Sequence, residues 1–221
     1  MDTNSVFSRT ETDGTILSDQ MYNLILGAVL CWGFFLNWLI VETVDPVAVL
    51  EATPIWLFFL MYFASCFCGI WLFTKSTRPT ISFFGYNLVV VPFGFVVNLV
   101  IAGYDEAIVR DAIQVTCGVV AMMMMLGTVF PDFFQKISTT LFWGLGLVVF
   151  FELFLVFTGR GQPGWIDWAV ALLFCGYIGY DWGRANQIPK TVDNAIDSAA
   201  ALYMDIINLF VRVLLIKGEE D

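Results

Sequence analysis

Seven long apolar stretches constrain this chain more than any other feature of its sequence. A helix needs roughly 20 consecutive apolar residues to cross the hydrocarbon of a bilayer, and each stretch reaches that length. The chain is 59% hydrophobic and only 14% charged, which lies outside the range of soluble domains. We therefore predict an all-α integral membrane protein with seven transmembrane helices. The predicted spans are about 21–42, 54–74, 80–103, 108–130, 138–158, 165–186 and 194–216.

The segments between the apolar stretches are short and rich in turn residues, which leaves no room for a soluble domain. We expect one membrane domain over 21–217, preceded by a polar, acidic tail over 1–20. The first apolar stretch is longer than the core of a signal peptide, and no cleavage-site pattern follows it, so we expect it to be retained. The charged residues of the tail are Asp2, Arg9, Glu11, Asp13 and Asp19.

The composition excludes several classes of function. The chain contains no histidine, which excludes histidine-ligated zinc, serine–histidine hydrolysis and pH sensing by histidine. Its net charge of −10 argues against a nucleic-acid partner, because phosphate binding needs a basic surface. We expect no enzymatic activity and no bound cofactor. The five cysteines lie in apolar segments without a CxxC pair, and so indicate neither zinc nor disulfides: Cys31, Cys66, Cys68, Cys117 and Cys175.

The distribution of lysine and arginine weakly favours one orientation in the membrane. Six of these residues fall on the side of the N-terminus and four on the other side, which favours a cytoplasmic N-terminus. The membrane itself, a bacterial inner membrane or the endoplasmic reticulum, is left open. The six are Arg9, Lys75, Arg78, Lys136, Arg184 and Lys190, and the four are Arg110, Arg160, Arg212 and Lys217.

Two aspartates inside apolar helices indicate a functional site. Asp181 and Asp205 lie in the last two predicted spans, and an ionised carboxylate in hydrocarbon costs several kcal/mol. Two carboxyl groups close together cannot both ionise cheaply, so the pair would share a proton and titrate as a unit. At low pH the proton would join the two helices. At higher pH the second charge would push them apart, or a calcium ion would bridge the two carboxylates.

The last predicted span carries a narrow polar stripe. Plotted at about 100° per residue, its polar side chains fall within about 100° of arc, and the rest of the helix is apolar. Such a stripe faces a water-filled cavity or a polar partner; the alternative is a packing helix whose aspartate bonds a neighbouring hydroxyl. We expect Asn208 to supply a neutral oxygen to the aspartate pair. The stripe consists of Asp197, Ser198, Asp205, Asn208 and Arg212.

Basic residues on the predicted cytoplasmic side would tune the pair, and Arg184, Lys75 and Arg78 are the candidates. The chain positions set a geometric condition. Asp205 lies about 11 residues into its span, whereas Asp181 lies about five residues from the end of the preceding one. The two can meet only if the last helix begins outside the hydrocarbon or dips inward.

The same residues carry a resemblance to a known family. Gly-Tyr-Ile-Gly-Tyr-Asp-Trp-Gly at 176–183 and Leu-Tyr-Met-Asp-Ile-Ile-Asn-Leu-Phe at 202–210 resemble the C-terminal signature of the transmembrane Bax inhibitor motif family, with a specific match over about 170–218. The resemblance implies seven helices with the last one surrounded by the other six. It also implies a pH-dependent calcium leak gated by a pair of aspartates, here Asp181 and Asp205. In that family a basic residue ending the second helix contacts the pair, which implies Lys75 or Arg78.

Two features depart from the family pattern. The fourth predicted span carries Met122 to Met125 and Leu126 in place of small and polar residues. Glu152 sits in the middle of the fifth span, in Phe-Phe-Glu-Leu-Phe, and maps onto no family site. It is either a second ion-binding or proton-relay carboxylate, or a carboxyl kept neutral or paired, with Arg110 or with another helix.

Two other functions stay open beside the calcium leak. A non-conducting regulator of cell death or of a membrane protease would act through helix contacts, with unidentified membrane-protein partners besides the lipid bilayer. An intramembrane aspartyl protease also uses two transmembrane aspartates, one after a tyrosine as in Tyr180-Asp181. Asp205, however, follows Leu-Tyr-Met rather than Gly-x-Gly, and the Pro-Ala-Leu element of such proteases is missing. A retinal-type pigment is disfavoured, because no lysine lies inside the last span.

Overall fold

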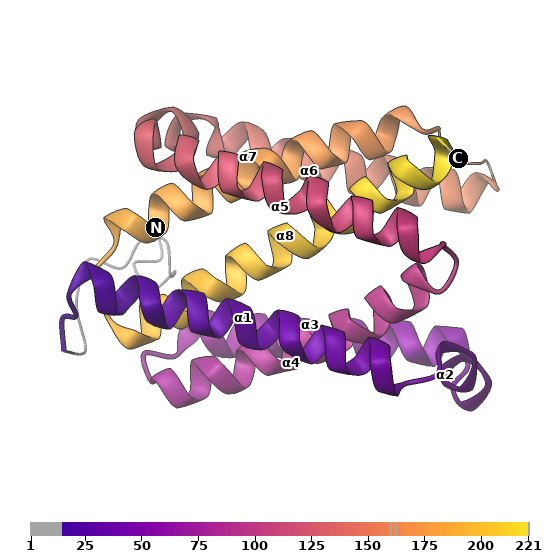
Figure 1. Cartoon of the computed structure of the whole chain (residues 1–221), viewed down its shortest axis with the longest axis horizontal. Coiled ribbons are helices and arrows are strands. Elements are labelled where there is room, and N and C mark those ends of the chain that lie inside the picture. The colour runs from indigo at the N-terminus through magenta and orange to yellow at the C-terminus, as the bar shows by residue number, and fades with distance from the viewer. Residues whose placement is uncertain (1–14, 160, 162, 221) are drawn as a thin grey trace. The chain divides into compact units, whose positions relative to one another are not determined.

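A computed structural model of the chain describes residues 15–159, 161 and 163–220, and these form eight α-helices and no strand. The predicted all-α class is therefore confirmed (Figure 1). The helices are α1 (Asp19–Thr43), α2 (Pro46–Ala52), α3 (Ile55–Lys75), α4 (Pro79–Ile101), α5 (Glu106–Val129), α6 (Pro131–Thr158), α7 (Trp165–Gln187) and α8 (Val192–Glu220).

Six helices of the described chain are long and apolar enough to cross a membrane, namely α1, α3, α4, α5, α6 and α8. The predicted span over 165–186 forms helix α7, but α7 is not among the six, so seven spans are not confirmed. The reason is composition. Asp167, Asp181 and Arg184 lie in α7 among glycine, tryptophan and tyrosine, which lowers its apolar character although it is 23 residues long.

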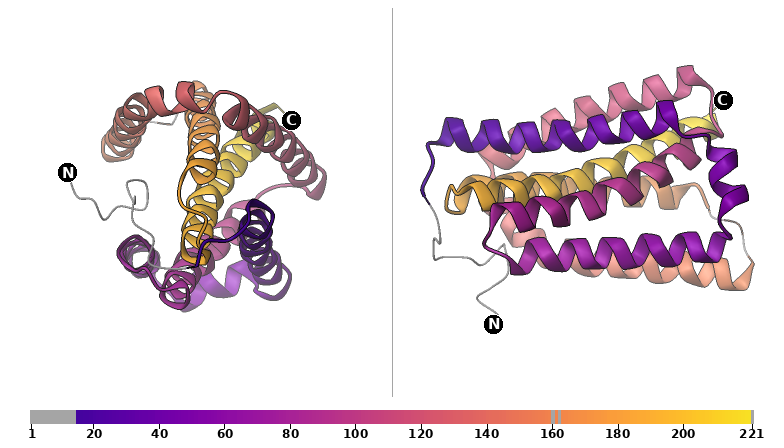
Figure 2. Two further views of the ribbon diagram at one scale, coloured as in Figure 1. Left: turned by 90° about the vertical axis from the view of Figure 1, so that its left-hand side faces the viewer. Right: turned by 90° about the horizontal axis from the view of Figure 1, so that it is seen from below.

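Three helices of the described chain, α2, α4 and α6, begin at a proline. Pro131 is the first residue of α6, seven residues before the predicted span over 138–158, and its missing N–H is not needed at that position. Pro46 likewise begins α2, whose N-cap Asp45 accepts a 2.9 Å hydrogen bond from the Val47 amide. Figure 2 shows α2 as a short helix between the end of α1 and the start of α3.

Most of the predicted acidic tail, including Asp2, Arg9, Glu11 and Asp13, lies outside the described residues. Asp19 is already the first residue of α1. The side chain of Ser18 accepts a 3.3 Å hydrogen bond from the Met21 amide and caps this helix. The first transmembrane helix therefore begins with ordinary capping chemistry, two residues before the predicted boundary.

The helices form two compact units. The first contains the described residues up to Gly103 together with Gln187–Tyr203. In it α4 packs against both α3 and α1, which lie side by side with it in Figure 1. Tyr86 of α4 donates a 3.0 Å hydrogen bond to the Val29 carbonyl of α1, and Asn37 of α1 donates one of 2.7 Å to the Tyr203 hydroxyl. Buried tyrosines thus hold this unit together with satisfied hydroxyl groups.

The second unit contains residues 104–186 and 204–220, and so includes α5, α6, α7 and the C-terminal part of α8. Gly179 and Gly183 of α7 lie against Gly127 of α5, where a Cβ on any of them would meet backbone oxygen or an aromatic ring. The small-xxx-small spacing of Gly179 and Gly183 therefore brings two helices into close contact. Trp182 adds a 2.7 Å hydrogen bond from its indole N–H to the Thr128 hydroxyl of α5.

Helix α8 is the most buried of the six candidate spans. Of the 18-residue apolar stretch of α8, 72% is buried, whereas between 11% and 39% of the corresponding stretch is buried in each of the other five helices. Its residues 192–203 belong to the first unit and its residues 204–220 to the second. A helix with this degree of burial can carry charged side chains that would be too costly on a lipid-facing helix.

The contact between Gly127 and α7 supports a prediction about stability. We expect Gly127→Ala to lower the free energy of unfolding in detergent by about 1–3 kcal/mol, because the new Cβ would press on the Gly179 backbone. Gly118→Ala on the same helix is the matched control, since a Cβ there meets nothing within 4 Å. Thermal unfolding of the two variants measures the difference. Equal stability of both variants would contradict the close packing of α5 and α7.

Candidate functional site

Asp181 of α7 and Asp205 of α8 meet in the second unit. Each residue is only 7% exposed, and their carboxyl groups share a side-chain hydrogen bond. The other oxygen of Asp205, Oδ2, is buried and has no hydrogen-bond partner among the described residues. Buried polar atoms without partners are rare in folded proteins, and they are often found at functional sites.

The glycines of α7 explain why Asp181 faces α8. Gly179 and Gly183 both lie against Gly127 of α5 and against the start of α6, at Phe134 and Pro131 respectively. Asp181 is two residues from each, which turns its side chain about 200° away from theirs around the helix. The local sequence Gly-Tyr-Asp-Trp-Gly therefore places small residues on the face toward α5 and the carboxyl group on the opposite face.

Asp181 and Asp205 lie at different distances from the loop between α7 and α8. Asp181 lies six residues before the end of α7 at Gln187, and Asp205 lies thirteen residues after the start of α8 at Val192. In helix rise these separations are about 9 Å and about 20 Å. The first twelve residues of α8 belong to the first unit, and only from Met204 does the helix join α7 in the second.

Other polar groups surround the pair. Arg184 lies one helical turn after Asp181, interacts with it electrostatically, and has no hydrogen-bond partner for its buried Nε among the described residues. Tyr177, one turn before Asp181, interacts electrostatically with both aspartates. Tyr177 was not among the site residues predicted from the sequence, although its spacing of four residues from Asp181 places the two on one face of the helix.

Lys75 and Arg78 lie in the first unit, where Lys75 ends α3 and Arg78 precedes α4. Both side chains are exposed. The predicted contact of one of them with the aspartate pair stays a prediction.

The polar stripe of α8 is divided between the two units. Ser198 shares a 3.0 Å hydrogen bond with the Tyr22 hydroxyl in the first unit, where the neighbouring Asp197 is 1% exposed. Asn208, in the second unit, donates a 2.7 Å hydrogen bond from its amide to the Met204 carbonyl of its own helix. The supporting roles of Asp197 and Asn208 stay predictions.

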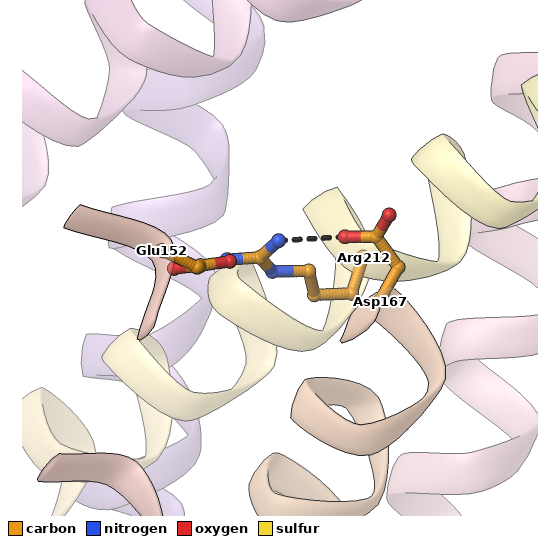
Figure 3. Close-up of polar contacts among 3 residues, drawn as sticks. All are labelled: Glu152, Asp167 and Arg212. Carbon is orange, nitrogen blue, oxygen red and sulfur yellow. Dashed lines mark hydrogen bonds and ion pairs between the residues drawn. The ribbon is translucent and has the colours of Figure 1, made fainter. Parts of the chain in front are cut away.

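A second cluster of charged residues lies further along α8. Arg212 forms an ion pair of 2.7 Å with Glu152 of α6 and one of 2.6 Å with Asp167 of α7, so that its guanidinium lies between the two carboxylates (Figure 3). The side chains are 18%, 23% and 5% exposed for Arg212, Glu152 and Asp167. We refer to these three residues as the Arg212 triad.

The triad answers one question that the sequence left open. Glu152 is paired with Arg212, and not with Arg110, which instead contacts Glu106 at 3.0 Å on the exposed surface. Asp167 was missed because it stands at the start of a predicted span, where a charge is inexpensive. It lies fourteen residues before Asp181, within about 40° of it around α7. This shared helix face could have identified Asp167 as a candidate site residue from the sequence.

No group of three or more cysteine, aspartate or glutamate side chains that could hold a metal ion occurs in the part of the chain that the structure describes. Calcium takes six to eight oxygen ligands. An ion bridging Asp181 and Asp205 would therefore draw most of its ligands from backbone carbonyls or water.

Comparison with known proteins identifies the family. Residues 16–221 match the model of a protein family described as "Inhibitor of apoptosis-promoting Bax1". The chain belongs to this family. The resemblance predicted from the last two helices is confirmed, and the match extends over nearly all of the chain. We refer to the family below as the Bax inhibitor family.

Several relatives from plants and bacteria share this similarity. Protein LIFEGUARD 3 of Arabidopsis thaliana is 27% identical over 186 residues, which cover 80% of this chain and 74% of the relative. An uncharacterized protein of Helicobacter pylori is 30% identical over 171 residues, with coverages of 74% and 71%. An uncharacterized membrane protein of Streptococcus pyogenes serotype M3 is 28% identical over 135 residues, with coverages of 58% and 59%. Together with the apolar helices, these relatives identify the chain as an integral membrane protein.

Proposed function

We propose that this Bax inhibitor family member is a pH-sensitive calcium leak, controlled by the proton that Asp181 and Asp205 share. The observation that carries the proposal is the hydrogen bond between two buried carboxyl groups on different helices. Such a bond needs a proton on one of the two groups, because an ionised carboxylate can only accept. Proton binding at this pair is therefore coupled to the contact between α7 and α8.

Loss of the shared proton would leave two negative charges side by side in a site with little water. Such charges repel each other strongly at low dielectric, and they attract a divalent cation, which carbonyl and carboxylate oxygens can bind. Either response changes the contact between α7 and α8. The proposal is that this change opens or closes a path for calcium through a bundle of seven helices, in which the other six surround α8.

The orientation and the membrane that we propose follow from the sequence. The weak excess of basic residues on one side favours a cytoplasmic N-terminus, in a bacterial inner membrane or in the endoplasmic reticulum. The chain would act without a bound cofactor and without catalysing a reaction, with calcium as the ion that binds or passes.

A second candidate is a non-conducting regulator of cell death. The description of the family as an inhibitor of an apoptosis-promoting protein favours it. In that case the carboxyl pair would only hold α7 and α8 together, and Asp205→Asn would have no effect on ion movement. The two functions are therefore separated by one experiment.

The experiment measures calcium entry into proteoliposomes containing the purified chain, from about pH 5 to about pH 8. We expect the calcium flux of the wild-type protein to differ by roughly tenfold across this range, and Asp205→Asn to lose most of that difference. Asp111→Asn, which changes an exposed aspartate of α5, is the matched control and should behave as wild type. Flux no higher than in empty liposomes would exclude the leak and favour the regulator.

A further inference from the structure

The Arg212 triad places three charged groups where charge is costly. Glu152 is surrounded along α6 by Phe150, Phe151, Leu153 and Phe154, whose side chains face outward and would contact lipid. The three members come from α6, α7 and α8, and together they carry one negative charge when all are ionised. Removing one member of such a buried cluster leaves an uncompensated charge. The three side chains are therefore held strongly in place.

Arg212 occupies the position of a cation between two carboxylates. Its two terminal nitrogens contact oxygens of Glu152 and Asp167 at 2.7 and 2.6 Å, the lengths of charge-assisted hydrogen bonds. A guanidinium is protonated at all physiological pH values and binds carboxylates through a rigid fork of donors. It is therefore a permanent positive charge, in contrast to the titratable Asp181–Asp205 pair.

The position of Arg212 on α8 relates it to that pair. Arg212 follows Asp205 by seven residues, which places the two within about 20° on one face of the helix and about 10 Å apart along its axis. Asn208 lies between them on the same face, and all three belong to the second unit. A cation that leaves Asp205 along this polar face would next meet the guanidinium.

We propose that Arg212 is a tethered cation that forms a second barrier to calcium, in series with the Asp181–Asp205 pair and held in place by Glu152 and Asp167. This inference rests on the proposed calcium leak, and adds to it a residue that limits the flux. The barrier is local, because the triad as a whole is negative: the guanidinium occupies the space between the two carboxylates and repels a divalent cation only at close range. It also blocks the two carboxylates, which would otherwise attract calcium. Removal of the guanidinium should therefore raise the flux at every pH.

The test uses Arg212→Gln in the full-length chain, reconstituted in proteoliposomes and compared with wild type. Calcium flux should rise by about tenfold at both acidic and neutral pH, while the release of a trapped anionic dye should not change. Glu152→Gln combined with Arg212→Gln should show a smaller gain, because one attracting carboxylate is also removed. Arg110→Gln, which removes an exposed arginine of α5, is the control and should match wild type.

The outcomes separate this inference from the proposed function. A pH-dependent flux in the wild type with no increase in Arg212→Gln would overturn the barrier and leave the leak standing. No flux in either protein would overturn the leak and the barrier with it. Equal release of calcium and of the anionic dye would also overturn the barrier, since it would indicate a damaged bundle.

A third variant keeps the test decisive if Arg212→Gln does not fold. Arg212→Lys retains the charge, but a lysine ammonium is a compact donor that cannot bridge both carboxylates in the same way. We expect it to fold and to show a flux between those of wild type and a protein without the barrier. A folded Arg212→Lys with the flux of wild type would count against the bridging geometry and overturn the proposal.

Discussion

Arg212→Gln is expected to lower the free energy of unfolding by about 3–5 kcal/mol in calcium-free detergent solution. The physical reason is charge compensation. In the folded protein the guanidinium compensates part of the charge of the Glu152 and Asp167 carboxylates, which are mostly removed from solvent. Without it, two negative charges remain close together, whereas in the unfolded chain both are hydrated. Chemical unfolding followed by tryptophan fluorescence measures the loss.

A neutral triad is the decisive comparison for this prediction. Glu152→Gln, Asp167→Asn and Arg212→Gln combined remove every charge, and buried ion clusters can often be replaced by uncharged groups at little cost. We expect the triple variant to recover most of the lost stability. Arg110→Gln should have little effect, because exposed ion pairs contribute little. An Arg212→Gln variant as stable as wild type would contradict the prediction, because it would show that the two carboxylates do not need the guanidinium for stability.

The fold was predicted best where apolar length alone decides the structure. A stretch such as 80–103 has no alternative to a membrane helix, and α4 begins and ends within two residues of the prediction. Helix boundaries were predicted less accurately where one residue type can have two structural roles. Pro131 reads equally well as a break or as the first residue of a helix, and only the packed structure distinguishes them.

The candidate site was predictable in part for an energetic reason. A charge inside an apolar helix needs a partner, which identified Asp181, Asp205, Glu152 and Arg212 without any structure. The identity of the partner could not be derived in the same way, since it depends on how three helices cross. Asp167 illustrates the limit. At the first turn of α7 it has the sequence context of an ordinary helix start, and only the structure places it against Arg212.

Asp181→Asn and Asp205→Asn are expected to have equal effects on the pH response of calcium flux, and the double variant no greater effect than either. The reason is that two hydrogen-bonded carboxyl groups titrate as a unit. Removing either member removes the shared proton, so each single variant should reduce a roughly tenfold difference in flux between acidic and neutral pH to almost none. Independent groups would instead give effects that multiply in the double variant.

The control for this comparison is Asp111→Asn, which leaves the buried pair intact and should keep the full pH response. Correct folding of every variant can be established by its thermal unfolding in detergent. An asparagine at either position can still hydrogen-bond to the remaining carboxyl group, so we expect the folds to be retained.

The ratio of calcium flux at acidic pH to that at neutral pH, measured in proteoliposomes for wild type, Asp181→Asn, Asp205→Asn and the double variant, tests the shared proton most directly. A paired-carboxylate gate predicts a ratio far from one in the wild type and close to one in the other three. A wild-type ratio preserved in either single variant would contradict it, and the control of calcium flux would then have to lie elsewhere in the protein.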